Sequence, residues 1–231
     1  MTEVITAGIA TAVGLVFAFS TWRRWLAGRK RHELAWSISL TMFAIAAFSL
    51  GLGAQTGWTS VVFRLFYLFG AILNVPYLAL GTIYLHFGER TGDRVGAAIV
   101  VFSLFAVVII TMAPLTHALP VHQLAQGSKV FGAWPRVLAG VGSGAGAITI
   151  FAGAAYSFLR AQTARFRISN LLIAAGTAIA GASGLLNSIF GAMTAFAIAL
   201  AVAICVIYLG FLAATSLGVR SVAPVTDPPT A

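Results

Sequence analysis

Seven long apolar runs divide the chain, and they constrain its fold more than any other feature. They cover residues 4–21, 34–54, 61–87, 95–114, 136–158, 168–191 and 194–216. A bilayer core about 30 Å thick needs about 20 apolar residues in one helix, because each residue adds about 1.5 Å. We therefore predict an all-α integral membrane protein in which residues 1–216 form one domain of seven transmembrane helices.

The composition agrees with this class of protein. Hydrophobic residues make up 60% of the chain and charged residues 8%, whereas soluble domains have about 45–50% and about 25%. The segments between the runs are short, so no soluble catalytic or nucleic-acid-binding domain fits between them. Residues 217–231 contain three prolines and are predicted to form a flexible cytoplasmic tail.

The positive charges are distributed unevenly between the predicted loops. Eleven Lys and Arg residues fall on one side, in the loops after runs one, three and five and in the tail, whereas the other side has only Lys129 and Arg136. Basic loops are retained in the cytoplasm. We therefore predict an external N-terminus, a cytoplasmic C-terminus and a location in the plasma (inner) membrane. Orientation then explains the formal charge of +9, and we expect no nucleic-acid partner.

The first basic loop combines cations with tryptophans. Its cations are Arg23, Arg24, Arg29, Lys30 and Arg31. A cation near anionic lipid contributes about 1 kcal/mol to membrane binding. We therefore expect these five residues to contact anionic headgroups of the bilayer, and a protein-docking surface is the alternative.

Run three carries most of the polar side chains that are predicted to lie in the membrane. On a helix, Arg64, Tyr67, Asn74 and Tyr77 share one broad face. Asn74 precedes Pro76, whose missing N–H leaves the carbonyl of residue 72 without its helical donor. This face is a candidate binding site for a small polar or anionic molecule, with Arg64 at its external mouth. The alternative is structural, with Asn74 bonded to another helix and Arg64 reaching the headgroups.

Runs five and six are rich in small residues. Run five contains Gly140, Gly142, Gly144 and Gly146, which form two overlapping GxxxG patterns. Such patterns favour close helix packing, either within the chain or with a second copy or another membrane protein. Run six carries a polar stripe and Asn187. If run three faces run six, Asn187 joins Asn74 in lining one cavity.

Short similarities relate the first three runs to the last three. Ser20-x-x-Arg23 matches Ser157-x-x-Arg160, and Val75-Pro76-Tyr77-Leu78 parallels Val206-Ile207-Tyr208-Leu209. One interpretation is a 3+1+3 parallel repeat with run four as a linker helix, and the other is chance similarity between apolar segments. The plan of spans resembles that of the SWEET and PQ-loop carriers. The chain lacks their Pro-Gln pair and has no proline in runs one, two, five and six, so we transfer no site residues from them.

Several mechanisms are disfavoured by what the runs lack. No Asp or Glu lies in any run, which argues against proton or sodium coupling, and no lysine is available for a retinal Schiff base. The four histidines fall in loops or at run ends, so we expect no metal or cofactor. A haem between His32 and His86 and a metal at His117 and His122 are the alternatives. No hydrolase or phosphate-loop motif is present, so we do not expect an enzyme.

Two classes of function stay open. The first is a passive carrier or solute-binding bundle that works without proton or sodium coupling. The second is a receptor-like sensor or an accessory subunit of a membrane complex. A central cavity lined by Tyr67, Asn74 and Asn187 would favour the first class. A filled centre, with the glycines of run five turned outward, would favour the second.

Overall fold

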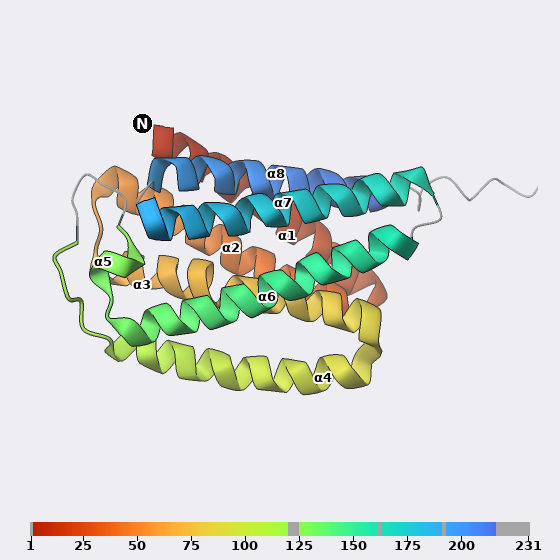
Figure 1. Ribbon diagram of the computed structural model, residues 1–231, viewed down its shortest axis with the longest axis horizontal. Helices are drawn as coiled ribbons and strands as arrows, with labels where there is room; N and C mark the ends of the chain where they lie inside the picture. Colours follow the sequence, from red (N-terminus) through yellow and green to blue (C-terminus); the bar gives the residue numbers. More distant parts are fainter. Residues whose placement is uncertain (1, 120–124, 161–162, 191–192, 216–231) are drawn as a thin grey trace, which may run out of the picture.

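The computed structural model describes residues 2–119, 125–160, 163–190 and 193–215, which form an elongated bundle of helices (Figure 1). Within these residues the only pairing of extended chain is an isolated antiparallel bridge between Leu115 and Phe131. The predicted all-helical class is therefore confirmed. The elements are α1 (Thr2–Gly28), α2 (Arg31–Thr56), α3 (Ser60–Phe66), the π-helix η1 (Tyr67–Leu73), α4 (Asn74–Met112), α5 (Gly127–Val130), α6 (Ala133–Arg160), α7 (Ala164–Phe190) and α8 (Met193–Thr215).

Five described helical segments are long and apolar enough to cross a membrane. They are Thr2–Gly28, Arg31–Thr56, Ser60–Met112, Ala133–Arg160 and Thr194–Ala213. The number differs from seven for two reasons. Runs three and four belong to one helical stretch, Ser60–Met112, and α7, which is rich in Gly, Ser and Ala, is not among the five. The count of seven and the membrane orientation stay predictions.

The stretch Ser60–Met112 is not one straight rod. Gly88 has φ 78° and ψ 178°, which is far from helical geometry, and the chain reverses direction there (Figure 1). Glycine adopts a positive φ without the steric penalty that other residues incur. The residues before and after Gly88 therefore form two antiparallel segments. Most large side chains of the second segment, including Val101, Leu104 and Met112, are exposed, as expected for a helix surrounded by lipid.

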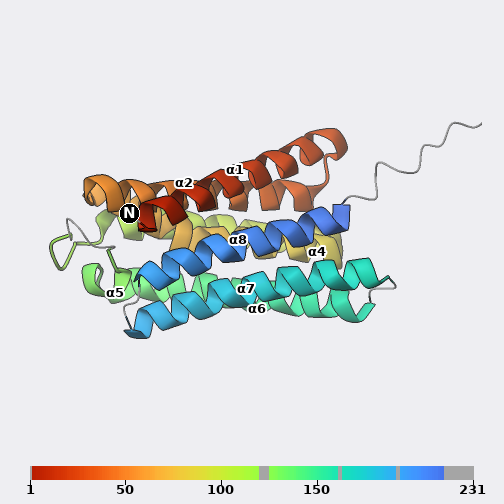
Figure 2. The same ribbon diagram turned by 90° about the horizontal axis from the view of Figure 1, so that it is seen from above.

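The long helices form a closed ring of neighbours. α1 packs on α2, α2 on α4, α4 on α6, α6 on α7, α7 on α8, and α8 returns to α1. Figure 2 shows α8 lying between α1 and α7. The ring closes through Phe17 of α1, whose ring centroid lies 4.9 Å from that of Tyr208 and 4.7 Å from that of Phe211. The first and last long helices are thus direct neighbours.

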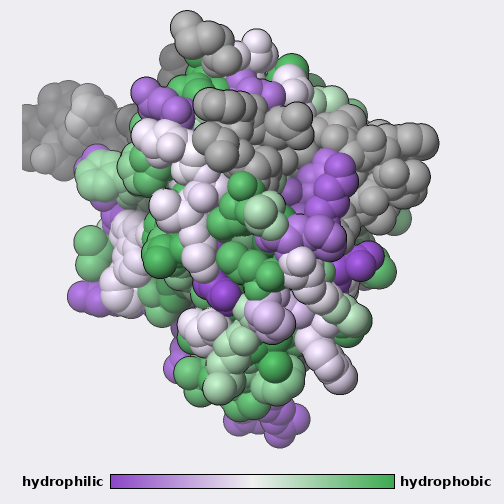
Figure 3. Space-filling view, turned by 90° about the vertical axis from the view of Figure 1, so that its left-hand side faces the viewer, coloured by the Kyte–Doolittle hydropathy of each residue, from purple (hydrophilic) through white to green (hydrophobic). Residues whose placement is uncertain are grey.

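The two ends of the bundle differ in chemistry. One end, the basic end, holds the α1–α2 connection, the Gly88 reversal and the end of α6 (Figure 1). Its cations are Arg23, Arg24, Arg29, Lys30, Arg31, Arg90, Arg94, Arg160, Arg165 and Arg167. The other end holds the N-terminus and the α2–α3 connection, and its surface mixes hydrophilic and hydrophobic side chains (Figure 3). The predicted tail, residues 217–231, lies outside the described residues.

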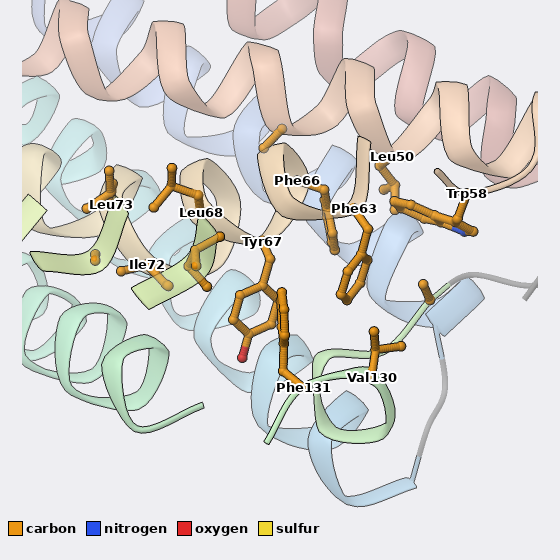
Figure 4. Packing of buried hydrophobic residues seen from close by; sticks show 14 of the residues in the cluster. Leu50, Trp58, Phe63, Phe66, Tyr67, Leu68, Ile72, Leu73, Val130 and Phe131 are labelled. Carbon is orange, nitrogen blue, oxygen red and sulfur yellow. The ribbon is translucent and has the colours of Figure 1, made fainter. Parts of the chain in front are cut away.

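A cluster of aromatic side chains fills the end of the bundle that lies opposite the basic end. We call it the aromatic end. Phe131, which follows α5, lies with its ring centroid 5.1 Å from those of Phe63 and Tyr67. Trp58 packs edge-on against Phe63, with centroids 5.7 Å apart. Figure 4 shows these rings between α3, η1 and the short helix α5, which ends at Val130. Ala125, Val130 and Phe131, which precede α6, therefore belong to the apolar core at this end of the bundle.

Candidate functional site

A π-helix lies at the predicted polar site in run three. Tyr67–Leu73 have the wider π-helical turn, and the backbone N–H of Asn74 bonds to the carbonyl of Phe69, five residues earlier. Pro76 follows two residues later and has no N–H to donate. The sequence predicted the missing bond at Pro76, but it assumed an ordinary α-helix before that residue and did not indicate the π-helical turn.

Hydroxyl groups from both neighbouring helices donate to this segment. Ser143 Oγ of α6 lies 2.6 Å from the carbonyl oxygen of Ala71. Ser39 Oγ of α2 lies 2.7 Å from the carbonyl oxygen of Asn74. Two backbone acceptors around the π-helix are therefore satisfied by hydroxyl groups of neighbouring helices. Neither serine was singled out from the sequence, because their partners are backbone atoms on other helices.

Glycines of α6 allow this close approach. A Cβ on Gly142 would lie 2.7 Å from the carbonyl oxygen of Ile72, and one on Gly146 would lie 2.9 Å from a methyl carbon of Val75. Both distances are shorter than van der Waals contact. One predicted GxxxG pair thus packs α6 on the π-helix and α4. The other pair, Gly140 and Gly144, has nothing within 4 Å of its Cβ positions and is exposed.

Two of the predicted residues have a feature that a ligand site needs. Asn74 has a side-chain amide without a hydrogen bond among the described residues, and Tyr77 lines a groove. Asn74 is half-buried. The Tyr77 hydroxyl lies 3.3 Å from Ser103 Oγ in the second segment of α4. Tyr77 also lines a groove of about 240 Å³ between α2 and α4. The other lining residues are Arg31, Leu34, Ala35, Ile38, Leu80 and Tyr84.

Arg64 and Tyr67 occupy the aromatic end instead. Arg64 donates to the carbonyls of Ile110 and Ala113, the latter at 2.8 Å, and to Ser60 Oγ at 3.1 Å. These carbonyls belong to the last turn of α4 and its C-cap, where helical donors are lacking. Tyr67 is buried against Phe131. Neither residue lines the α2–α4 groove, so the structure does not bring all the predicted residues round one space.

The predicted partner in run six lies elsewhere in the ring. Asn187 belongs to α7, and its side chain lies outside the described part of the structure. α7 packs against α6 and α8, whereas the π-helix and α4 pack against α2 and α6. A cavity shared by Asn74 and Asn187 therefore stays a prediction. A second groove, of about 320 Å³, lies between α1 and α2 and is lined mainly by apolar residues such as Val4, Leu15 and Phe48.

Glu33 is buried at the basic end, although the sequence placed it in a loop. It lies in the first turn of α2 and is 1% exposed. Arg24 donates through Nε to Glu33 Oε1 at 2.9 Å and also through Nη2. Burial opposes ionisation of the Glu33 carboxyl, but the neighbouring His32 and Arg24 outweigh it and hold its pKa below the ordinary value. Its Oε2 has no hydrogen-bond partner in the described structure.

The five predicted lipid-contacting cations occupy three settings. Arg23 and Arg24 extend α1 beyond run one, Arg29 and Lys30 form the two-residue connection, and Arg31 begins α2. Arg29 has φ 52° and lies 4.8 Å from the ring centroid of Trp25. The others are placed at the same end, where contact with headgroups stays a prediction.

Arg31 is engaged with the turn after Gly88. It forms ion pairs with Asp93 and, at 3.6 Å, with Glu89. The Tyr84 hydroxyl lies 2.9 Å from Asp93 Oδ1. Together the hydroxyl of Tyr84 and the guanidinium of Arg31 hold the pKa of Asp93 below its ordinary value. This network ties the start of α2 to both segments of α4.

The histidines are spread over separate environments. His32 packs edge-on against Trp36, and His86 bonds to groups on α4 and α6. His117 lies 3.2 Å from the neighbouring Thr116 hydroxyl, and His122 lies outside the described residues. Within the described residues no group of three or more His, Cys, Asp or Glu could hold a metal.

Comparison with protein-family models, with curated proteins and with solved structures finds no match for this chain.

Proposed function

We propose that the protein is a plasma-membrane protein that crosses the bilayer seven times, with its N-terminus outside and its C-terminus in the cytoplasm. The reversal at Gly88 supports two crossings within Ser60–Met112. The basic end, placed in the cytoplasm, would then follow the positive-inside rule. A protease site inserted at either terminus tests this. Cleavage of both sites from the same side of sealed vesicles would refute it.

We propose that this bundle is a passive carrier, or a solute-binding protein, for a small polar molecule. The observation that carries the proposal is the π-helix followed by Pro76. Beside this bend, Ser143 donates to the carbonyl of Ala71 and Ser39 to the carbonyl of Asn74. Single-turn π-helices in α-helices are frequent at functional sites, and proline is a common cause of sharp bends. The Asn74 amide beside this bend has donors and an acceptor for a ligand.

The charges in the bundle support a polar solute rather than an anionic one. Three donor nitrogens of Arg64 already bond to Ser60 and to two carbonyls at the end of α4. An anion that binds Arg64 would have to replace these hydrogen bonds. Glu33 forms an ion pair with Arg24, so the positive charge of Arg24 compensates the negative charge of the carboxylate. Transport without proton or sodium coupling therefore remains the proposal, although Glu33 is buried.

Ligand-induced thermal stabilisation of the purified protein, with a panel of neutral polar solutes, tests this site. A solute that stabilises the wild type should lose its effect on Asn74→Leu, because the amide would contact it directly. Asn187→Leu should behave alike if α7 contributes to the same cavity. Asn170→Leu is the matched control, since it removes an amide from α7 near the basic end. An unchanged thermal shift in a folded Asn74→Leu variant would exclude this site.

A second function, an accessory subunit of a membrane complex, is favoured by the outward pair of glycines on α6. Gly140 and Gly144 leave an open, exposed strip that another helix could approach closely. Native mass spectrometry of protein extracted in mild detergent tests this function. A stable complex that dissociates in Gly144→Leu would support it, whereas a monomer in both variants would contradict it.

A further inference from the structure

A histidine and a serine meet between α4 and α6 at the basic end. His86 Nε2 lies 2.8 Å from Ser157 Oγ, and His86 Nδ1 lies 2.9 Å from the carbonyl oxygen of Thr82. A carbonyl oxygen only accepts hydrogen bonds, so Nδ1 carries the proton in the neutral ring. Nε2 then presents its lone pair to the serine hydroxyl. This is the arrangement of a nucleophile, a base and a group that orients the base.

The close packing of two parallel helices sets this contact. A Cβ on Gly153 would collide with the methyl group of Thr82, so α6 comes this close to α4 only because residue 153 is glycine. One turn further along both helices, Ser157 reaches His86. The two residues are 71 positions apart in the chain, which is why no sequence motif reveals them.

The hydrogen bond of Ser157 differs from those of most helical hydroxyls in the described structure. Ser37, Ser49, Ser103 and Thr149, for example, each donate to the carbonyl four residues earlier in their own helix. That bond satisfies the hydroxyl locally and makes it inert. The hydroxyl of Ser157 is directed across the helix interface to a base instead.

The surroundings of the pair are open and cationic. Ser157 and His86 are half-buried, whereas Tyr156 and Arg160 are exposed. The Tyr156 ring packs edge-on against His86, with centroids 5.6 Å apart, and the Arg160 guanidinium lies 5.1 Å from the Tyr156 centroid. Residues three apart share one side of a helix, so Arg160 lies on the same side of α6 as Ser157. A reactant at the bundle surface could therefore reach both.

We propose that Ser157 and His86 form a nucleophile–base pair that takes an acyl group from a carboxylic ester at the membrane surface. Ser157 Oγ attacks the carbonyl carbon, and its proton passes to His86 Nε2. The ester C–O bond then breaks, and the departing alkoxide takes that proton and leaves as an alcohol. Water, deprotonated by His86, attacks the acyl carbon; the bond between that carbon and Ser157 Oγ breaks, Ser157 takes the proton back from His86, and the carboxylic acid leaves. Arg160 supplies the positive charge beside the developing oxyanion. This activity is independent of the proposed solute site.

Covalent labelling with a fluorescent fluorophosphonate tests the nucleophile. The full-length protein is reconstituted in vesicles of phosphatidylcholine and phosphatidylglycerol, and the labelled residue is located by mass spectrometry. We expect labelling at Ser157, its complete loss in Ser157→Ala, and a rate at least about 100-fold lower in His86→Gln, because a general base contributes about 10²–10⁴-fold. Thr149→Ala is the control on the same helix and should label normally, because the Thr149 hydroxyl donates to the carbonyl of Ala145 and contacts no base.

Two outcomes of the labelling experiment would overturn the proposal. One is a folded wild-type protein, with its helical circular dichroism intact, that takes no label at Ser157. The other is a folded His86→Gln variant that labels at the wild-type rate, because the hydrogen bond would then be structural only. Thermal unfolding of the wild type and of each variant, all purified in one detergent, separates loss of reactivity from loss of fold.

Two substrates distinguish the sources of the ester. Fatty acid released from the vesicle phospholipid, and absent in Ser157→Ala, would identify a lipid ester. Release of nitrophenol from dissolved p-nitrophenyl butyrate, without fatty acid, would identify a soluble ester. If neither is hydrolysed above the Ser157→Ala background, acyl transfer by this pair is refuted.

Discussion

The ion pair between Arg24 and Glu33 should respond asymmetrically to removal of its two partners. The Glu33 side chain is 2% exposed, whereas that of Arg24 is 40% exposed. Arg24→Met therefore leaves a buried carboxylate with only His32, 3.7 Å away, beside it, and removing one partner of a buried ion pair costs about 3–5 kcal/mol. Glu33→Met leaves a guanidinium that can turn to water, so we expect a loss of only about 1 kcal/mol. Both variants break the bonds between Arg24 and Glu33, so the expected difference follows mainly from the unequal burial of the two side chains.

The double variant completes a thermodynamic cycle. With both charges replaced by methionine, no buried charge is left, and the free energy of unfolding should return to within about 1 kcal/mol of the wild type. Reversible unfolding with dodecyl sulfate in mixed micelles, followed by circular dichroism, measures all four proteins. Equal losses in the two single variants, or a double variant as unstable as Arg24→Met, would refute this account of the pair.

The pH dependence of the same proteins gives a second measurement. The pKa of Glu33 is lowered in the folded protein from its reference value of 4.5. The stabilisation from the ionised carboxyl is therefore complete above about pH 4.5, and it is lost as the pH falls through the lower folded pKa. Wild-type stability should decline in acid more steeply than that of the double variant. Parallel curves for the two proteins would contradict the assigned shift.

Four further substitutions test the packing. Gly142→Leu should destabilise the fold by at least about 2 kcal/mol, because the new side chain pushes α6 off the π-helix. Gly140→Leu should change the free energy of unfolding by under about 0.5 kcal/mol. Similar losses in the two variants would refute the assignment of Gly142 to the packed face of α6 and of Gly140 to the exposed face. Arg64→Gln should cost about 1–3 kcal/mol in the same unfolding assay, because it leaves carbonyls at the end of α4 unpaired, and an unchanged stability would show that water replaces it. Ser143→Ala should cost about 0.6 kcal/mol, the average for a hydrogen bond between membrane helices, and should speed amide hydrogen exchange around Pro76; unaltered exchange would mean that the hydroxyl does not hold the bend.

Periodicity and composition were enough to predict the helical class and the approximate position of most helices. They also located Pro76, because a missing N–H is a property of one residue. The π-helical turn could not be predicted, since it shifts the hydrogen-bond register without changing the apolar pattern. Glu33 was misplaced for a related reason. A charged residue beside a basic loop looks solvated in the sequence, and only the folded chain shows Arg24 covering it.

The candidate site was predicted less well than the fold. Arg64 was expected either at the mouth of a cavity or at the headgroups, and the sequence could not show that the carbonyls at the end of α4 lie within its reach. The glycine face of α6 was correctly expected to pack closely, yet the sequence could not say which of the two GxxxG pairs faces inward. The contact between His86 and Ser157 was invisible, because it depends on the register of two helices that are far apart in the chain.

The contact between α1 and α8 has a consequence for how the protein is made. During synthesis the first helix is made long before the last one. Until Tyr208 and Phe211 emerge from the ribosome, Phe17 therefore contacts lipid or an insertion factor in their place. Nascent chains that stop before α8 would keep this flank uncovered and should be the species that quality-control proteases degrade.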